Sequence, residues 1–168
     1  MAEPNILGLG LLYVGAVLFV NAIYILGYTS SRDAAVMNLF TGGLTFLNAI
    51  YFAFVGETAF AAAQTLLFSF TYLWVFVEFW WERESMRALG WYCLFVAICA
   101  APTGILTFSS LPILGIIWET WAYLWFVFFL FMGLELDIPK ETAYSTMGVA
   151  LLTWAYAYYI LAFSGTPI

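Results

Sequence analysis

The chain has 168 residues, of which 65% are hydrophobic and only 8% are charged. So few polar residues cannot cover a soluble domain, and four Lys and Arg residues are too few for a nucleic-acid-binding surface. The net charge of -6 comes largely from acidic residues near the ends of apolar stretches, so it indicates no particular partner. We therefore expect one membrane domain over residues 1–168, with its function within or between helices.

Six apolar stretches fill most of the chain, and each is close to the ~20 residues with which a helix crosses a bilayer. The stretches cover residues 5–27, 34–55, 59–80, 88–108, 119–136 and 142–163. The first has neither a basic leading segment nor a small-residue cleavage site, so we expect a retained helix rather than a signal peptide. This pattern predicts an all-α, multi-pass membrane protein with six transmembrane helices.

Basic residues occur only in alternate connections between these stretches: Arg32 follows the first, Arg83 and Arg87 follow the third, and Lys140 follows the fifth. Lys and Arg are retained on the cytoplasmic side of a membrane. The pattern therefore predicts that these three connections are cytoplasmic and that both termini lie outside.

Most connections are short, which favours antiparallel neighbours. The exception is the segment 109–118, where Ser-Ser-Leu-Pro precedes a short apolar fragment. We expect this segment to fold as a lip over the outer mouth, with the fifth helix beginning at Glu119.

A weak internal repeat relates the helices as hairpins. The motif at 11–13 returns at 66–68 and the motif at 39–40 returns at 94–95, so both are repeated after 55 positions. Repeats of this kind favour three helix hairpins around an axis along the membrane normal, where a pore would run. Chance similarity between leucine-rich helices is the alternative.

Signatures of enzyme chemistry are missing from the sequence. There is no His, the two Cys are not spaced as a metal site, and no nucleophile has a base nearby, so we expect no catalytic residues, no metal and no cofactor. No ionisable residue lies at the centre of a predicted helix, which disfavours an ion-coupled transporter. Glu78 and Glu135 lie near cytoplasmic helix ends, where they either anchor the helices or flank a cytoplasmic mouth.

Three helices carry large apolar side chains at helical spacing. A stripe at steps of three or four predicts one helix face, which either packs in the core or lines a pore. The stripes are Leu7, Leu11, Val14, Leu18 and Asn21; Phe70 and Trp74; and Trp121, Trp125, Phe128 and Met132, with Phe131 alongside. An uncharged aromatic slot opposes ions, which would lose their water there, but admits flat neutral solutes such as urea and small amides.

Four segments resemble one known family. They are Leu7-Gly-Leu-Gly-Leu-Leu-Tyr-Val-Gly15, Ala35-Val-Met-Asn-Leu-Phe-Thr-Gly-Gly-Leu44, Leu66-Leu-Phe-Ser-Phe-Thr-Tyr-Leu73 and Trp91-Tyr-Cys-Leu-Phe-Val-Ala-Ile98. In order and content they are similar to the AmiS/UreI family of bacterial urea and amide channels. The resemblance implies a six-helix protomer in the bacterial inner membrane, assembled as a homohexamer with one pore in each protomer.

The resemblance also implies site residues. Its pore positions correspond to the three stripes above, from Leu7 to Met132 but without Asn21, and an acidic position at the outer mouth corresponds to Glu119. The proton-gated member of the family has a long, histidine-containing outer loop, where this chain has only Gly56-Glu57-Thr58. A sequence with no His lacks the usual side chain that titrates between pH 5 and 8, so the expectation is an amidase-associated, non-gated branch.

The function expected from these observations is passive, pH-independent permeation of urea and short-chain aliphatic amides such as acetamide. Two alternatives remain open at this point: a membrane scaffold for a cytoplasmic amidase, and a secondary active amide transporter. The expected partners are small neutral amide solutes and the lipid bilayer, without nucleic acid.

Overall fold

The computed structural model describes residues 5–56 and 58–163, and this part of the chain is helical with no strand. Glu57, in the short link predicted to replace the long outer loop, lies outside the described residues. Six helices in the described part are long and apolar enough to cross a membrane, as predicted. The elements are α1 (Ile6–Ile25), α2 (Ser31–Phe54), α3 (Ala59–Trp80), α4 (Arg87–Phe108), α5 (Pro112–Phe128), the π-helix η1 (Phe129–Gly133) and α6 (Pro139–Phe163).

The predicted lip between the fourth and fifth helices is wrong. α5 begins at Pro112, so residues 113–117 form its first turns and only a short connection precedes it. Proline suits the first position of a helix, because its fixed φ is helical and no hydrogen bond there needs its missing N–H. Ser-Ser-Leu-Pro is thus a helix start, and the fifth span is longer at this end than predicted.

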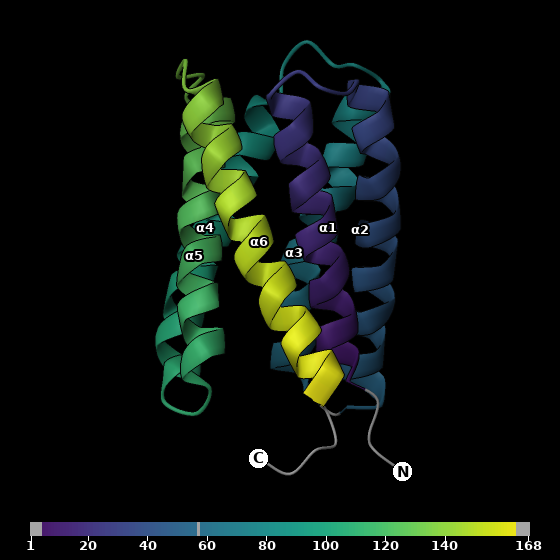
Figure 1. The fold of residues 1–168 in the computed structure, drawn as a ribbon, viewed down its shortest axis with the longest axis vertical. Helices are drawn as coiled ribbons and strands as arrows, with labels where there is room; N and C mark the ends of the chain where they lie inside the picture. Colours follow the sequence, from purple (N-terminus) through teal and green to yellow (C-terminus); the bar gives the residue numbers. More distant parts are fainter. Residues whose placement is uncertain (1–4, 57, 164–168) are drawn as a thin grey trace.

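The helices form a ring in chain order that is closed by α6 against α1 (Figure 1). The closest packing joins α2 with α3, α4 with α5, and α6 with α1, whereas packing within the predicted hairpins is looser. α6 runs obliquely across the bundle, beside α5 at one end and beside α1 at the other. The hairpins expected from the repeat are therefore not the most tightly packed units of the fold.

Glycine allows this close approach in each of the three tight pairs. A Cβ on Gly42 of α2 would lie 2.8 Å from Leu73 Cγ of α3, and a Cβ on Gly15 of α1 would lie 2.9 Å from the backbone nitrogen of Trp154 of α6. A Cβ on Gly115 of α5 would lie 2.6 Å from Phe108 Cα of α4, and a Cβ on Gly90 of α4 would collide with the backbone of Gly133 in η1, which continues α5. Small residues at helix contacts are typical of membrane proteins, in which dispersion between close backbones replaces the hydrophobic driving force.

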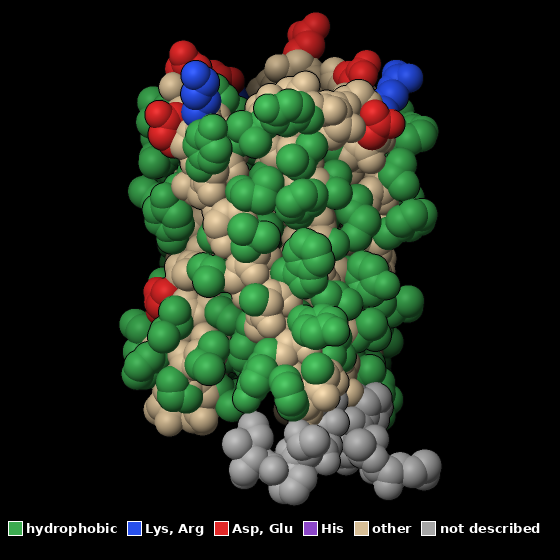
Figure 2. Space-filling model, in the orientation of Figure 1, with side chains coloured by type: hydrophobic (Ala, Val, Ile, Leu, Met, Phe, Trp, Pro, Cys, Tyr) green, Lys and Arg blue, Asp and Glu red, His purple; other side chains and the backbone are tan. Residues whose placement is uncertain are grey.

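The two ends of the bundle differ in charge. Lys and Arg gather at the end that holds the connections 26–30, 81–86 and 134–138 (Figure 2), which we call the charged end. The opposite end, which we call the termini end, holds the start of α1 and the ends of α2, α4 and α6 (Figure 1). Ion pairs join the connections at the charged end, where Arg32 lies 3.6 Å from Glu82 and Arg87 lies 3.7 Å from Glu135.

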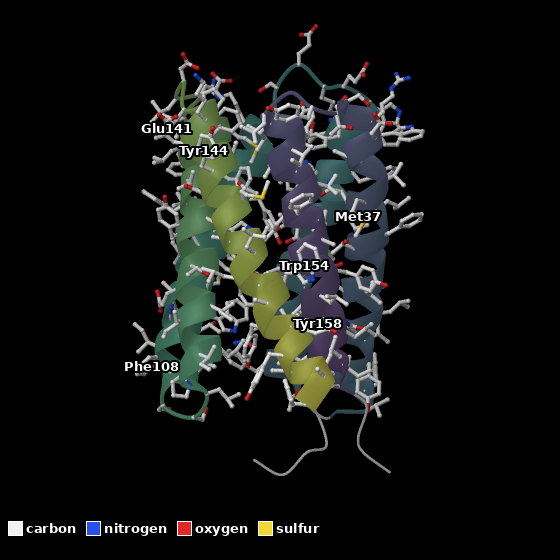
Figure 3. The ribbon with its side chains drawn as sticks, in the orientation of Figure 1. Met37, Phe108, Glu141, Tyr144, Trp154 and Tyr158 are labelled. Atoms are coloured by element: carbon white, nitrogen blue, oxygen red, sulfur yellow. The ribbon has the colours of Figure 1, made fainter. Side chains whose placement is uncertain are left out.

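The sides of the bundle are apolar, as expected for a membrane-spanning protein. Tyr144, Trp154 and Tyr158 lie on the outer surface of α6 (Figure 3), and each is at least 45% exposed. Comparable exposed side chains follow α2 and α4. A surface of this composition is suited to lipid or to other apolar helices rather than to water.

Two adjacent glycines provide a test of the close packing between α2 and α3. Gly42→Ala should lower the free energy of unfolding by about 1–3 kcal/mol, the usual cost of overpacking, because the new methyl group meets Leu73. Gly43→Ala is the matched control, because a Cβ at Gly43 meets none of the described residues within 4 Å. Apparent melting temperatures in detergent would measure both, and equal melting temperatures for the two variants would contradict this packing.

Candidate functional site

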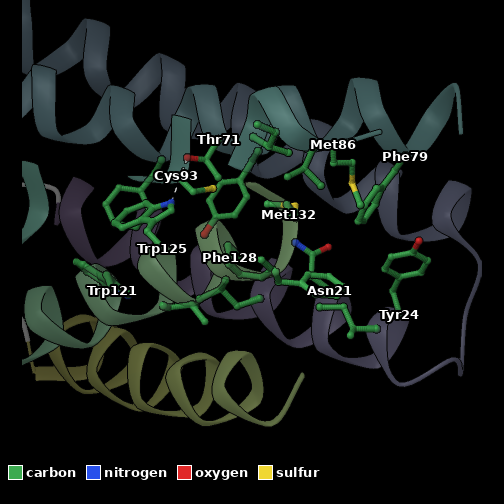
Figure 4. A pocket seen from close by; sticks show the side chains of 18 residues that line it. Asn21, Tyr24, Thr71, Phe79, Met86, Cys93, Trp121, Trp125, Phe128 and Met132 are labelled. Atoms are coloured by element: carbon green, nitrogen blue, oxygen red, sulfur yellow. Dashed lines mark hydrogen bonds between the residues drawn. The ribbon is translucent and has the colours of Figure 1, made fainter. Parts of the chain in front are cut away.

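Two cavities lie end to end inside the helix ring. The charged-end cavity has a volume of about 60 Å³ and is bounded by α1, α3, α4 and the fifth span (Figure 4). The termini-end cavity, of about 380 Å³, is bounded mainly by α1, α2, α3 and α5. One water molecule needs roughly 10–15 Å³ of such space, so the smaller cavity accommodates a few waters or one small solute.

A cluster of aromatic rings separates the cavities. Phe68 of α3 and Trp121 of α5 line both of them. The ring centroid of Phe68 lies 4.8 Å from that of Trp121, 4.8 Å from that of Trp125 and 5.6 Å from that of Trp118. We call these four residues the aromatic partition. The rings of the aromatic partition thus lie between the two cavities.

Threonine hydroxyl groups hold two of the indole rings in place. Trp121 Nε1 donates to Thr153 Oγ1 of α6 at 2.9 Å, and Trp125 Nε1 donates to Thr71 Oγ1 of α3 at 3.3 Å. A buried indole N–H needs such an acceptor. Because both N–H groups are satisfied by neighbouring helices, the rings are fixed and present apolar carbon to the cavities.

The charged-end cavity has little free hydrogen-bonding capacity. Asn21 of α1 and Asn38 of α2 exchange carboxamide hydrogen bonds of 3.2 and 2.7 Å, and Asn38 also donates to the Ala34 carbonyl at 2.9 Å. Asn38 has then used both N–H groups, whereas Asn21, which lines the cavity, keeps one N–H and one lone pair. Tyr72 also lines this cavity, and no described residue accepts from its hydroxyl or donates to it.

The π-helix at the end of the fifth span shapes the same cavity. Its wider turn places the consecutive residues Phe131 and Met132 on the cavity wall, although Met132 alone follows the α-helical stripe. η1 is held against α4 by the contact between Gly90 and Gly133. Tyr24 and Phe79, with ring centroids 4.5 Å apart, line this cavity together with Met86.

Most of the predicted pore residues lie along these cavities. Leu7, Leu11 and Val14 border the termini-end cavity. The charged-end cavity is bordered by Leu18, Asn21, Trp125, Phe128, Phe131 and Met132, and Trp121 borders both. The stripe on α1 thus follows the whole path, from the termini end to the charged end.

The predicted stripe on the third helix is on the wrong face, because Phe70 and Trp74 line neither cavity. Phe70 is 46% exposed on the outside of the bundle. Trp74 packs against Tyr92 of α4, with ring centroids 5.7 Å apart, and its Nε1 donates to Glu78 at 2.7 Å. The face that lines the cavities carries instead Phe68, Thr71, Tyr72, Val75 and Phe79.

The three acidic residues predicted at the mouths do not line the cavities either. Glu78 is buried, and its Oε2 lies 3.9 Å from Arg83 Nε without a hydrogen bond to any described residue. Glu135 is exposed and pairs with Arg87. Glu119 lies roughly 10 Å along the helix from Pro112, and its exposed carboxylate packs against Gly104 of α4.

Several residues that shape the path are not among the predicted ones: Phe68, Trp118, Tyr72, Asn48 and Gln64. Trp118 falls in the predicted lip, although its spacing of three and seven residues from Trp121 and Trp125 continues the same stripe. Phe68, Tyr72 and Phe79 show helical spacing as regular as that of Phe70 and Trp74. That second stripe is the signal in the sequence for the correct face of α3.

Comparison with known proteins agrees with this architecture. Residues 6–163 match the model of the AmiS/UreI family transporters. The chain is 42% identical over 138 residues to a protein of Mycolicibacterium smegmatis named as an amidate substrates transporter, and the match covers 77% of this chain but 63% of that protein. It is 42% identical over 131 residues to a Rhodococcus erythropolis protein named as the transporter AmiS2, covering 74% of this chain and again 63% of the relative.

The fold matches a solved structure over nearly its full length. The cryo-EM structure of the Helicobacter pylori urea channel in its closed state superposes with a TM-score of 0.83 at 31% sequence identity, covering 93% of this chain and 97% of that one. The crystal structure of the same channel gives a TM-score of 0.82 at 34% identity. These relatives are channels or transporters rather than enzymes. Six helices of the described residues are long and apolar enough to cross a membrane, and the family match covers almost all of those residues. This multi-pass membrane protein therefore belongs to the AmiS/UreI family of transporters.

Proposed function

We propose that this chain is a passive, pH-independent channel for urea and short-chain aliphatic amides. The observation that carries the proposal is that two cavities lie end to end through the helix ring and that, among the described residues, no charged side chain lines either of them. The urea channel of Helicobacter pylori and the amide transporter names of the other relatives support the same solute class.

The uncharged walls favour neutral solutes. An ion entering the charged-end cavity would lose most of its hydration and gain almost no polar contact, which is prohibitively costly. A small amide loses only the hydration of one carbonyl and one amino group. The free N–H and lone pair of Asn21 and the hydroxyl of Tyr72 replace part of that hydration.

Independence from pH follows from the placement of the titratable groups. The sequence contains no His, and in the described residues the acidic side chains and the Arg and Lys side chains lie outside both cavity walls. A change in the protonation of these side chains between pH 5 and 8 therefore adds no charge to the cavity walls. The same arrangement disfavours coupling of solute movement to protons.

The proposal includes orientation and assembly. The charged end carries the four basic residues of the chain, so we place it in the cytoplasm and both termini outside the bacterial cytoplasmic membrane. The protein acts as a single channel domain over residues 1–168. The apolar outer faces of α2 and α4 suit contacts with neighbouring copies in a homohexamer, with one path through each copy.

Flux measurements on reconstituted protein test the proposal directly. Proteoliposomes should show urea and acetamide permeabilities above those of empty vesicles, with no more than about a twofold difference between pH 5.5 and pH 7.5, a change of about 0.4 kcal/mol in the barrier. Stopped-flow light scattering would measure both. Amide permeability equal to that of empty vesicles at both pH values would rule the function out, and a steep rise at acidic pH would contradict ungated permeation.

Cys93 offers a test of access to the path. This buried thiol of α4 lines the charged-end cavity, whereas Cys99, the other cysteine, lines neither cavity. Neutral mercury(II) chloride should enter the cavity and inhibit acetamide flux, because the thiol loses a proton and bonds to mercury as chloride leaves. A permanently charged methanethiosulfonate reagent should not reach Cys93, because the uncharged walls oppose its entry.

The control for this test is Cys93→Ser, which should remain permeable and resist mercury(II) chloride. Cys99→Ser should remain as sensitive as the unmodified channel. Resistance of Cys99→Ser, or unchanged sensitivity of Cys93→Ser, would show that mercury acts elsewhere and that the cavity is closed to small neutral molecules.

A further inference from the structure

The termini-end cavity differs in character from the charged-end cavity. It is much the larger of the two, at about 380 Å³, and it carries more polar side chains. These come from α2, α3, and the end of α4 with the residues that follow it. They are Thr45, Asn48, Gln64, Thr65, Thr107 and Ser110.

Most of these hydroxyl groups already donate to a backbone carbonyl three or four residues earlier in the chain. Thr45 donates to the Thr41 carbonyl at 2.8 Å, Thr65 donates to the Ala61 carbonyl at 2.8 Å, and Ser110 donates to the Thr107 carbonyl at 3.3 Å. Their donor capacity is therefore used. The free capacity to bond a solute lies in the hydroxyl of Thr107 and in two primary carboxamides, those of Asn48 and Gln64.

Asn48 is buried but largely unpartnered. The residue is 6% exposed, and its one hydrogen bond to a described residue is a long one of 3.4 Å from Nδ2 to the Ile6 carbonyl. One N–H and the whole of Oδ1 have no partner in the same part of the chain. Gly10 of α1 leaves room for this side chain, because a Cβ there would lie 2.7 Å from Asn48 Nδ2. A buried carboxamide with an unpaired donor and acceptor gains stability when a polar solute forms hydrogen bonds with it.

Gln64 lies level with Asn48 on the neighbouring helix. The hydrogen bond of 2.9 Å from Ser69 to the Gly42 carbonyl sets the register of the antiparallel pair α2 and α3. Asn48 lies six residues beyond Gly42 and Gln64 lies five residues before Ser69, so both reach the same level of the cavity. Gln64 Nε2 donates to Thr103 at 3.3 Å, and its Oε1 remains without a partner among the described residues.

We propose that Asn48 and Gln64 form a binding site for neutral primary amides in the termini-end cavity, where a solute is captured before it crosses the aromatic partition. The proposal rests on the proposed function and names a site for it. Asn48 supplies a donor and an acceptor on one planar group, and Gln64 supplies a second acceptor. A primary amide or urea has the complementary carbonyl and N–H groups.

The chain itself contains the contact that such a solute would make. Asn21 and Asn38 pair their carboxamides reciprocally at 2.7 and 3.2 Å between α1 and α2. A solute amide takes the place of one partner of such a pair at Asn48. An ion is disfavoured at the same position, because no charged side chain of the described residues lines the cavity.

The concentration dependence of tracer acetamide uptake into proteoliposomes tests this site. Uptake by the unmodified channel should saturate, and Asn48→Leu and Gln64→Leu should each raise the half-saturating concentration by about fivefold, the effect of one lost hydrogen bond. Tyr51→Phe is the matched control: it removes a hydroxyl group from the next turn of α2, outside both cavities, and should leave the value unchanged.

Uptake that rises linearly without saturation, or half-saturating concentrations that are unchanged in both leucine variants, would overturn the site while leaving the channel function intact. If Asn48→Leu does not fold, the half-saturating concentration of Gln64→Leu alone tests the site. Saturation-transfer NMR of acetamide on the detergent-solubilised channel separates the two proposals, because it detects binding without flux. A signal that is lost in the double variant supports the site, and an undiminished signal overturns it.

Discussion

Close contact between helix backbones at glycine positions holds this helix bundle together. Gly42 against Leu73, Gly15 against Trp154 and Gly90 against Gly133 draw six helices into three tight pairs. Because packing between the pairs is looser, space remains at the centre of the ring. Both cavities lie in that space, so the same contacts that stabilise the fold also create its interior.

The chemistry of that interior is set by which polar groups are already satisfied. Thr153 and Thr71 accept the indole N–H groups of Trp121 and Trp125, so the aromatic partition presents carbon rather than donors. The polar groups left free are few and neutral, and they lie on both sides of the partition: Asn21 and Tyr72 at one side, and Asn48, Gln64 and Thr107 at the other. Under the proposed function, a neutral amide would therefore find partial replacement for its hydration before and after the rings, but not between them. This arrangement favours solutes with a low free energy of desolvation.

The number of membrane-spanning helices and the alternation of their direction can be predicted from the sequence, because length and hydropathy are enough for both. The grouping of Arg32, Arg83, Arg87 and Lys140 in alternate connections likewise predicts that one end of the bundle is the charged one, as Figure 2 shows. The aliphatic side chains of the predicted stripe on α1 border the cavities, and their role in lining a pore stays a prediction.

Which face of a membrane helix points inward is harder to predict, because lipid and protein interior are equally apolar. Phe68 and Phe70 are two positions apart, about 200° around the helix, and each belongs to a regular apolar stripe. Only the tertiary packing shows that Phe68 borders the path and that Phe70 lies outside. The prediction for Glu119 fails for a different reason: Pro112 starts the helix earlier, so a residue expected at the mouth lies about two turns inside the span.

Phe68 and Phe70 allow the route between the two cavities to be tested. If solutes cross the aromatic partition, Phe68→Trp should block acetamide flux in proteoliposomes by filling the space between the rings, whereas Phe70→Trp, with the same added volume on the outer surface, should leave the flux intact. Flux that survives Phe68→Trp in a correctly folded protein, or that is lost only in Phe70→Trp, would show that the path does not run between the two cavities.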